Sequence, residues 1–134
     1  MKSLGKNFQA KLLLVEDNAN YRKLIKETLS GEIPSLCIKE AADGKEAFQE
    51  IASCLPDIIF MDIGLPGENG LVLTKKIKQK YPKIVIVILT AYDLPEYQEA
   101  ALQNGAQYFL LKNTIISHRI ISVVEEWVLS QEKK

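Results

Sequence analysis

Acidic, hydroxyl and ammonium side chains occur in this sequence directly after short apolar runs. These residues are Glu16, Asp17, Asp62, Thr90 and Lys112. Carboxylates are hard oxygen ligands for a divalent cation such as Mg²⁺, and an aspartate is also a competent nucleophile toward phosphorus. A lysine and a hydroxyl group neutralise and orient phosphoryl oxygens. Together, these residue types predict a site that binds a divalent cation and a phosphoryl group.

The apolar runs have the composition of β-strands that are buried on both faces. Each run is too short for a helix and rich in Val, Ile, Leu or aromatic residues. Four runs end next to the residues above, and they span 11–15, 58–61, 84–89 and 108–111. A fifth strand is predicted over 36–41. Because ligands of an open parallel sheet bind at the carboxyl edge of its strands, we expect the polar residues along one functional edge.

Segments with apolar residues at helical spacing alternate with these strands. The first predicted helix ends at a C-terminal cap formed by Gly31, and the fourth runs from about Pro95 to Asn104. Five strands alternating with five helices predict an α/β fold, with a parallel sheet covered by helices on both faces. The apolar face of the fourth helix is made of Leu94, Tyr97 and two alanines, Ala100 and Ala101. Since the alanine side chains are small, we expect this helix to be weakly anchored and able to move.

Length and composition are those of one soluble domain. The chain has 134 residues, of which 47% are apolar and 25% charged, and its formal net charge is zero. A neutral chain creates no overall field that recruits nucleic acid or an anionic membrane. Cys37 and Cys54 lack metal-ligand spacing and are predicted to be reduced core thiols. Because neither a signal peptide nor a membrane-spanning run is recognisable, the sequence predicts a cytoplasmic protein without membrane association.

The acidic residues are the predicted metal ligands. Three carboxylates at one sheet edge repel one another, and a hard divalent cation offsets that repulsion. We expect Asp17 and Asp62 to bind Mg²⁺ directly and Glu16 directly or through water, with the main-chain carbonyl of Gly64 as a further ligand. The set contains no general base placed to activate water. It therefore favours accepting and holding a phosphoryl group over rapid hydrolytic turnover.

Four stretches of the sequence resemble the receiver (phosphoacceptor) domain of bacterial two-component response regulators. They are LLLVEDN (12–18), IIFMDIGLPGENG (58–70), VILTA (87–91) and YFLLK (108–112), in the order of the family. The resemblance begins at about residue 9, which makes 1–8 an N-terminal extension and 9–134 the receiver domain. It implies a doubly wound, flavodoxin-like fold with five helices and five parallel strands in the order 2-1-3-4-5.

The resemblance also implies a role for individual residues. Asp62 takes the position of the phosphoacceptor, Lys112 that of the phosphate partner, and Thr90 that of the switch hydroxyl. Phe109 stands where many members have a switch tyrosine, so a ring can rotate there but no hydroxyl contact is available. Asn113 follows the lysine where the family often has proline. Since LuxR/NarL-type receivers commonly lack that proline, the chain is closest in pattern to that subgroup.

The partners are implied by the resemblance as well. A sensor histidine kinase, or another phosphohistidine carrier, is the expected donor in a Mg²⁺-dependent transfer. The fourth helix, fifth strand and last helix form the expected output face, toward an output domain or partner, and the same face is a candidate homodimer contact. The protein is expected to be no enzyme, catalysing only its own phosphorylation and dephosphorylation. Direct nucleic-acid binding is not expected, and the cognate kinase, stimulus and oligomeric state stay open.

Two other classes of protein use part of the same chemistry. A haloacid-dehalogenase-type phosphatase also combines Asp, Thr or Ser, and Lys with Mg²⁺. Its second Asp, two residues after the nucleophile, is replaced here by Gly64. A flavodoxin-like flavin carrier binds its phosphate through hydroxyls and amides after the first strand, where Glu16 and Asp17 would repel it. Both alternatives therefore fit the residues less well than a phosphoacceptor.

Overall fold

A single parallel sheet forms the centre of the molecule. The computed structural model describes residues 9–113 and 115–132, so the predicted N-terminal extension, 1–8, lies outside the described residues. The strands are β1 (Lys11–Val15), β2 (Cys37–Ala41), β3 (Ile58–Met61), β4 (Val85–Thr90) and β5 (Tyr108–Leu111). All neighbouring strands run parallel, in the order β2-β1-β3-β4-β5. This confirms the predicted strand order.

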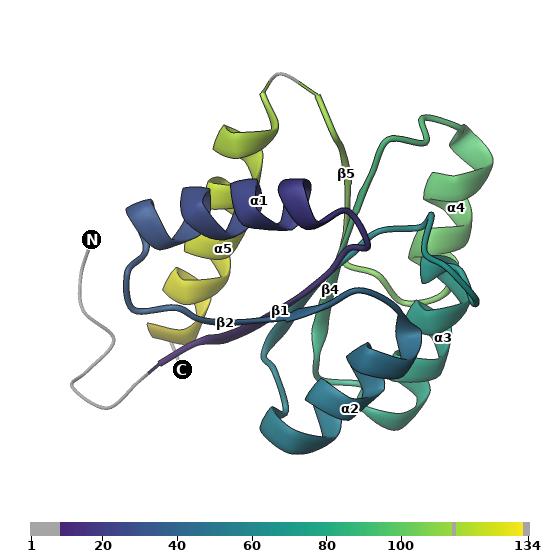
Figure 1. Cartoon of the computed structure of the whole chain (residues 1–134), viewed down its shortest axis with the longest axis horizontal. Coiled ribbons are helices and arrows are strands. Elements are labelled where there is room, and N and C mark those ends of the chain that lie inside the picture. Colours follow the sequence, from purple (N-terminus) through teal and green to yellow (C-terminus); the bar gives the residue numbers. More distant parts are fainter. Residues whose placement is uncertain (1–8, 114, 133–134) are drawn as a thin grey trace.

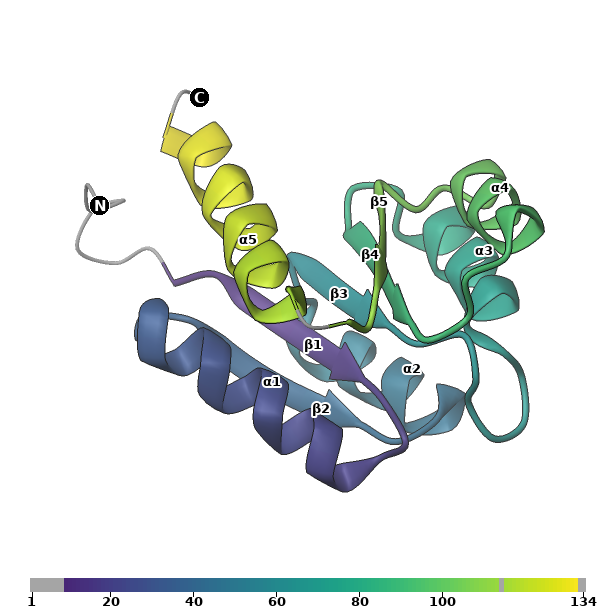
Figure 2. The ribbon, with the colours of Figure 1, turned by 90° about the horizontal axis from the view of Figure 1, so that it is seen from above.

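Helices cover the sheet on both faces (Figures 1 and 2). They are α1 (Ala19–Glu32), α2 (Gly44–Cys54), α3 (Gly70–Lys80), α4 (Pro95–Gln103) and α5 (Ile116–Glu132). α1 and α5 lie on one face, and α2, α3 and α4 lie on the other. The α/β fold with five strands and five helices is therefore as predicted.

Alternating residues of each strand supply the two cores. On β1, Leu12 and Leu14 pack toward α1 and α5, whereas Leu13 and Val15 pack toward α2 and α3. All four residues of β3 are fully buried. A strand covered on both faces gains from an apolar side chain at every position, which explains the unbroken apolar runs in the sequence.

Side-chain caps start three of the helices. Asn18 Oδ1 accepts a hydrogen bond from the Tyr21 N–H at 3.0 Å, and Asp43 Oδ1 accepts one from the Glu46 N–H at 2.9 Å. Asn69 Oδ1 accepts from two N–H groups of α3. Such caps satisfy amides that have no partner within the helix, and they fix where α1, α2 and α3 begin. All three helices begin on the side of the sheet where the strands end.

The predicted end of α1 at Gly31 differs from the structure, in which the helix continues to Glu32. Ile33 is the C-cap residue, and its N–H donates to the carbonyl of Leu29 at 2.8 Å. The Ile33 side chain is 1% exposed, so carrying the helix past Gly31 delivers an apolar side chain to the core. The prediction was wrong because tertiary burial, not the glycine, sets the end of this helix.

The two cysteines are not core residues. Cys37 and Cys54 are free thiols and both are half-buried. Cys37 begins β2, an edge strand, and Cys54 is the last residue of α2. The prediction of core thiols was wrong in this respect, since the positions at an edge and at a helix end leave part of each side chain accessible.

α4 is held to the sheet by few apolar side chains. Ala101 is the buried residue of this helix, and Tyr97 and Ala100 are half-buried. Leu94, predicted on the apolar face, precedes the helix and is 47% exposed. Its side chain provides no capping hydrogen bond. The structure therefore agrees with weak anchoring of α4, while movement of this helix stays a prediction.

No helix in the described part of the chain has the length and apolar character that a bilayer crossing requires.

Candidate functional site

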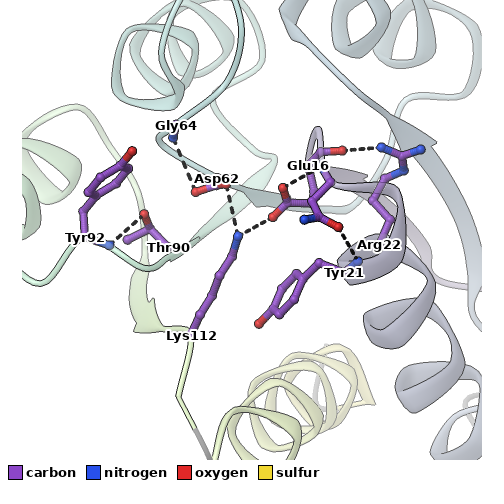
Figure 3. Close-up of polar contacts among 9 residues, drawn as sticks. Glu16, Tyr21, Arg22, Asp62, Gly64, Thr90, Tyr92 and Lys112 are labelled. Carbon is purple, nitrogen blue, oxygen red and sulfur yellow. Dashed lines mark hydrogen bonds and ion pairs between the residues drawn. The ribbon is translucent and has the colours of Figure 1, made fainter.

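The carboxyl edge of the sheet brings together the residues that the sequence singled out. Glu16, Asp62 and Lys112 each follow a strand, and their side chains point toward one another (Figure 3). Lys112 Nζ lies 3.1 Å from Asp62 Oδ2 and also forms a short ion pair with the Glu16 carboxylate. Thr90 is the last residue of β4 rather than the first residue after it. The strand order places these residues on neighbouring strands.

Three carboxylates form a compact cluster at this edge. One oxygen from each of Glu16, Asp17 and Asp62 lies within 4.8 Å of the others. Glu16 is 3% exposed and Asp62 8% exposed, whereas Asp17 is open to solvent. A set of hard oxygen donors with more negative charge than one ammonium can balance fits a divalent cation such as Mg²⁺. The Gly64 N–H donates to Asp62 Oδ1 at 3.4 Å, which brings this glycine to the same pocket.

Burial and ion pairing change the pKa values of Glu16 and Lys112 in the pocket. Burial raises the pKa of Glu16, although the hydrogen bonds from Lys112 and from the Asn18 N–H act in the opposite direction. Burial acts to lower the pKa of Lys112, but the hydrogen bond to Glu16 and the charge of Asp62 raise it above its usual value. Lys112 therefore remains a charged ammonium in the pocket at neutral pH.

Asn18, the N-cap of α1, and Arg22 hold the acidic loop, Glu16 and Asp17, in place. The Asn18 N–H donates to Glu16 Oε2 at 3.0 Å, and Arg22 Nη1 donates to the main-chain carbonyl of Glu16 at 2.6 Å. Arg22 also pairs with Glu40 of β2, with 3.2 Å between Nε and Oε1. Sequence reasoning missed Arg22, although its place one turn into a helix that follows the acidic pair is a usable signal. It ties α1, β1 and β2 together beside the pocket.

Thr90 and Tyr92 form the side of the pocket next to α4. Thr90 is fully buried, and its hydroxyl oxygen accepts a hydrogen bond from the Tyr92 N–H at 3.3 Å. A Cβ atom on Gly64 would lie 3.0 Å from Tyr92 Cε2 and 3.1 Å from its hydroxyl oxygen. The Tyr92 ring also contacts the Tyr97 ring of α4 edge-on, with 5.8 Å between centroids. Tyr92 therefore covers the backbone next to Asp62.

Phe109 precedes Lys112 by three residues and belongs to β5. It is half-buried on β5 and packs against the core formed by α2, α3 and α4. Phe109 also lines a cavity of about 210 Å³ with residues near the starts of α4 and α5, including Gln98 and Arg119. The ring therefore has space beside it, and its role as a switch stays a prediction.

If Asp62 carries a phosphoryl group, as the resemblance implies, removing the Tyr92 ring is expected to shorten the lifetime of that group. In Tyr92→Ala, the side chain over Gly64 is lost and water gains access to the pocket. We expect hydrolysis to be faster by about threefold to tenfold, the range for losing part of a water-excluding contact. Loss of the added mass with time after removal of the phosphodonor measures the rate. Tyr81→Ala, at the opposite edge of the sheet, is the control, and an unchanged rate in Tyr92→Ala would contradict the shielding role.

A doubly wound sheet with an acidic cluster and a lysine at its carboxyl edge is the arrangement that the resemblance to receiver domains implies. The sequence matches the family described as "Response regulator receiver domain" over residues 12–125. The chain belongs to this family. The match lies within the predicted domain, 9–134, whose outer boundaries stay a prediction. Neither the phosphatase nor the flavin-carrier alternative is supported.

Relatives and solved structures agree with this assignment. The chain is 36% identical over 114 residues to the oxygen regulatory protein NreC of Staphylococcus haemolyticus (strain JCSC1435), covering 84% of this chain and 52% of NreC. It thus spans about half the length of the curated relatives that it matches.

Two solved structures show the same fold. A CheY-like receiver domain protein from Methanospirillum hungatei JF-1 superposes with a TM-score of 0.84 at 23% identity, covering 94% of this chain and 98% of that one. A LuxR-family two-component response regulator from Aurantimonas sp. SI85-9A1 has a TM-score of 0.78 at 27% identity, with 92% and 87% coverage. The second likeness agrees with the subgroup that Asn113 indicated.

Proposed function

We propose that this chain accepts a phosphoryl group on Asp62 from a phosphohistidine of a sensor kinase or phosphotransfer protein. A carboxylate oxygen of Asp62 forms a bond to phosphorus as the phosphorus–nitrogen bond of the donor breaks, and the donor histidine leaves as an imidazole. The carrying observation is the placement of Asp62: a buried carboxylate, 3.1 Å from an ammonium, inside a cluster of acidic oxygens. The protein is then a self-modifying phosphoacceptor rather than an enzyme with external turnover.

Each neighbour of Asp62 has a separate part in the proposal. Lys112 neutralises an oxygen of the incoming phosphoryl group, and the Thr90 hydroxyl turns toward another. Glu16, Asp17, Asp62 and the Gly64 carbonyl would hold Mg²⁺, with Glu16 binding directly or through water. The cation would neutralise negative charge on the phosphoryl oxygens. Because the described residues of the pocket include no general base placed to activate water, the acyl phosphate is expected to persist long enough to carry a signal.

The proposed response passes from Thr90 to the α4-β5-α5 face. A hydroxyl drawn toward the phosphoryl group pulls on the β4–α4 segment, and Phe109 has cavity space beside its ring. α4 has one buried side chain, so displacing it loses little apolar burial. An output domain, a partner protein or a second copy would sense this face. Since the proposed donor is a histidine kinase, we expect the reaction to take place in the cytoplasm. We also expect these residues not to bind nucleic acid directly.

The proposal is tested by incubating the protein with acetyl phosphate and following its intact mass. With Mg²⁺ present we expect the mass of one phosphoryl group to be added, and with a chelator in its place we expect none. Equal uptake in both conditions would refute the metal requirement. No uptake with Mg²⁺, from acetyl phosphate or from a phosphorylated histidine kinase, would refute the proposed function.

Replacing Lys112 should separate metal binding from phosphoryl transfer. Lys112→Ala removes the charge next to Asp62 but keeps all three carboxylates, so Mg²⁺ binding should persist. Losing a charge-assisted hydrogen bond should slow uptake by about tenfold to a hundredfold. It should also abolish the change in amide chemical shifts of α4 that follows phosphorylation. Lys26→Ala, which removes an exposed lysine paired with Glu40, is the matched control. Wild-type shift changes in Lys112→Ala would remove this residue from the proposed mechanism.

A further inference from the structure

An aromatic ring lies against the ammonium group of the pocket. Tyr21 is in the first turn of α1, and Lys112 Nζ lies 4.4 Å from the centroid of its ring. Figure 3 shows the ring beside the lysine, on the α1 side of the pocket. A cation at this distance from a ring is attracted by the negative potential of the ring face, and more strongly where water is partly excluded. Lys112 therefore has an uncharged partner besides its two carboxylates.

The hydroxyl group of Tyr21 does not take part in this contact. It is turned away from Glu16 and Asp62 in Figure 3, and it is buried without a hydrogen-bond partner among the described residues. Burial also raises the pKa of Tyr21, so the side chain stays neutral. The contact with Lys112 thus comes from the ring face, and a phenylalanine ring would supply it equally.

The ring has little freedom to move from this place. The Tyr21 N–H donates to Asn18 Oδ1 at 3.0 Å as part of the cap of α1. The next residue, Arg22, donates to the Glu16 carbonyl at 2.6 Å. These two contacts join the first turn of α1 to the acidic loop, and the ring packs against the core between α1 and α5.

The carboxylate partners of Lys112 both change role in the proposed reaction, whereas the ring does not. Glu16 is needed for the cation, and an oxygen of Asp62 becomes bonded to phosphorus. A neutral ring neither competes for the cation nor repels the phosphoryl group. Of the three partners of Lys112, the ring is therefore the one that the proposed reaction leaves unchanged.

We propose that Tyr21 is a positioning residue for phosphoryl transfer, and that its ring face holds the Lys112 ammonium beside Asp62 throughout the reaction. This inference rests on the proposed function. It predicts that the ring, not the hydroxyl group, determines how fast Asp62 is modified.

The test compares Tyr21→Leu with Tyr21→Phe. Uptake from acetyl phosphate with Mg²⁺ should slow by about fivefold to thirtyfold in Tyr21→Leu and stay at the wild-type rate in Tyr21→Phe. A second readout needs no phosphoryl transfer: the NMR signals of the Lys112 ε-CH₂ group should show a ring-current shift in wild type and Tyr21→Phe that disappears in Tyr21→Leu. Leu24→Ala, an exposed apolar residue on the same helix, is the control and should change neither.

The outcomes separate this inference from the proposed function. Wild-type uptake in Tyr21→Leu would overturn the role of the ring, and so would a Tyr21→Phe variant as slow as Tyr21→Leu. Slow uptake in Tyr21→Leu with an unchanged Lys112 shift would also overturn it, because the defect would then not arise through Lys112. A wild-type protein that takes up no phosphoryl group while showing the ring-current shift would refute the proposed function instead.

Discussion

Replacing Asp62 with asparagine should abolish uptake of a phosphoryl group from acetyl phosphate. An amide lacks the anionic oxygen that forms the bond to phosphorus, so no acyl phosphate can form. The fold should persist, because the amide oxygen can still accept the hydrogen bond from Lys112, and the substitution gives up only the long contact, 3.4 Å, with the Gly64 N–H. Intact mass after incubation with Mg²⁺ and acetyl phosphate measures the effect. We expect no added mass where wild type gains one phosphoryl group.

Asp57→Asn is the matched control for this variant. Asp57 is a half-buried aspartate on the same chain, but it lies before β3, at the opposite edge of the sheet. Its Oδ2 accepts a hydrogen bond from the Lys11 N–H at 2.9 Å, which an amide oxygen can also do. Uptake should therefore be unchanged in Asp57→Asn. Wild-type uptake in Asp62→Asn would place the phosphoacceptor elsewhere.

The largest effect on stability is expected at Gly70. This residue begins α3, and a Cβ atom there would overlap the main-chain carbonyl oxygen of Asp62 and lie 2.8 Å from its carbonyl carbon. The Gly70 N–H also donates to the Ile63 carbonyl at 2.9 Å, which holds α3 against the end of β3. Because a rigid backbone cannot yield as a side chain does, Gly70→Ala should lower the free energy of unfolding by about 3 kcal/mol. The melting temperature should fall by roughly 10 °C.

Gly31→Ala provides a control of opposite sign. Gly31 lies inside α1 near its end, and a Cβ atom there would meet nothing within 4 Å. Alanine has the higher helix propensity, so the variant should gain about 0.5–1 kcal/mol. Thermal unfolding followed by circular dichroism measures both changes. Equal stabilities for Gly70→Ala and wild type would mean that α3 and β3 do not meet as closely as the structure indicates.

The sequence alone predicted the sheet and the residues at its edge because both have a strong local signal. Strands buried on two faces are unbroken apolar runs, and a polar residue directly after such a run, as Asp62 follows Met61, lies at the carboxyl edge. The boundary at Thr90 was wrong by one residue. β4 begins at Val85, because the Ile84 N–H donates to the Tyr81 carbonyl in the preceding turn. It extends through Thr90, because Thr90 pairs with Leu111 of β5.

What the sequence could not predict depends on contacts between distant segments. Tyr21 has the spacing of a core residue in α1, and nothing local indicates that its ring faces Lys112, far along the chain. The cover that Tyr92 forms over Gly64 depends likewise on the path of two loops. The end of α1 was wrong for a similar reason, since the burial of Ile33 outweighs the glycine signal. Local pattern thus predicts which residues reach the edge of the sheet, and tertiary packing decides which of them touch.

Chemical trapping of the modified residue tests the central claim most directly. Protein treated with Mg²⁺ and acetyl phosphate is reduced with sodium borohydride, which converts an aspartyl phosphate to homoserine, and is then mapped by peptide mass spectrometry. We predict homoserine at position 62 and unmodified aspartate at position 17. Homoserine at another position, or a phosphoryl group that survives borohydride as a phosphoester or a phosphohistidine, would contradict the account.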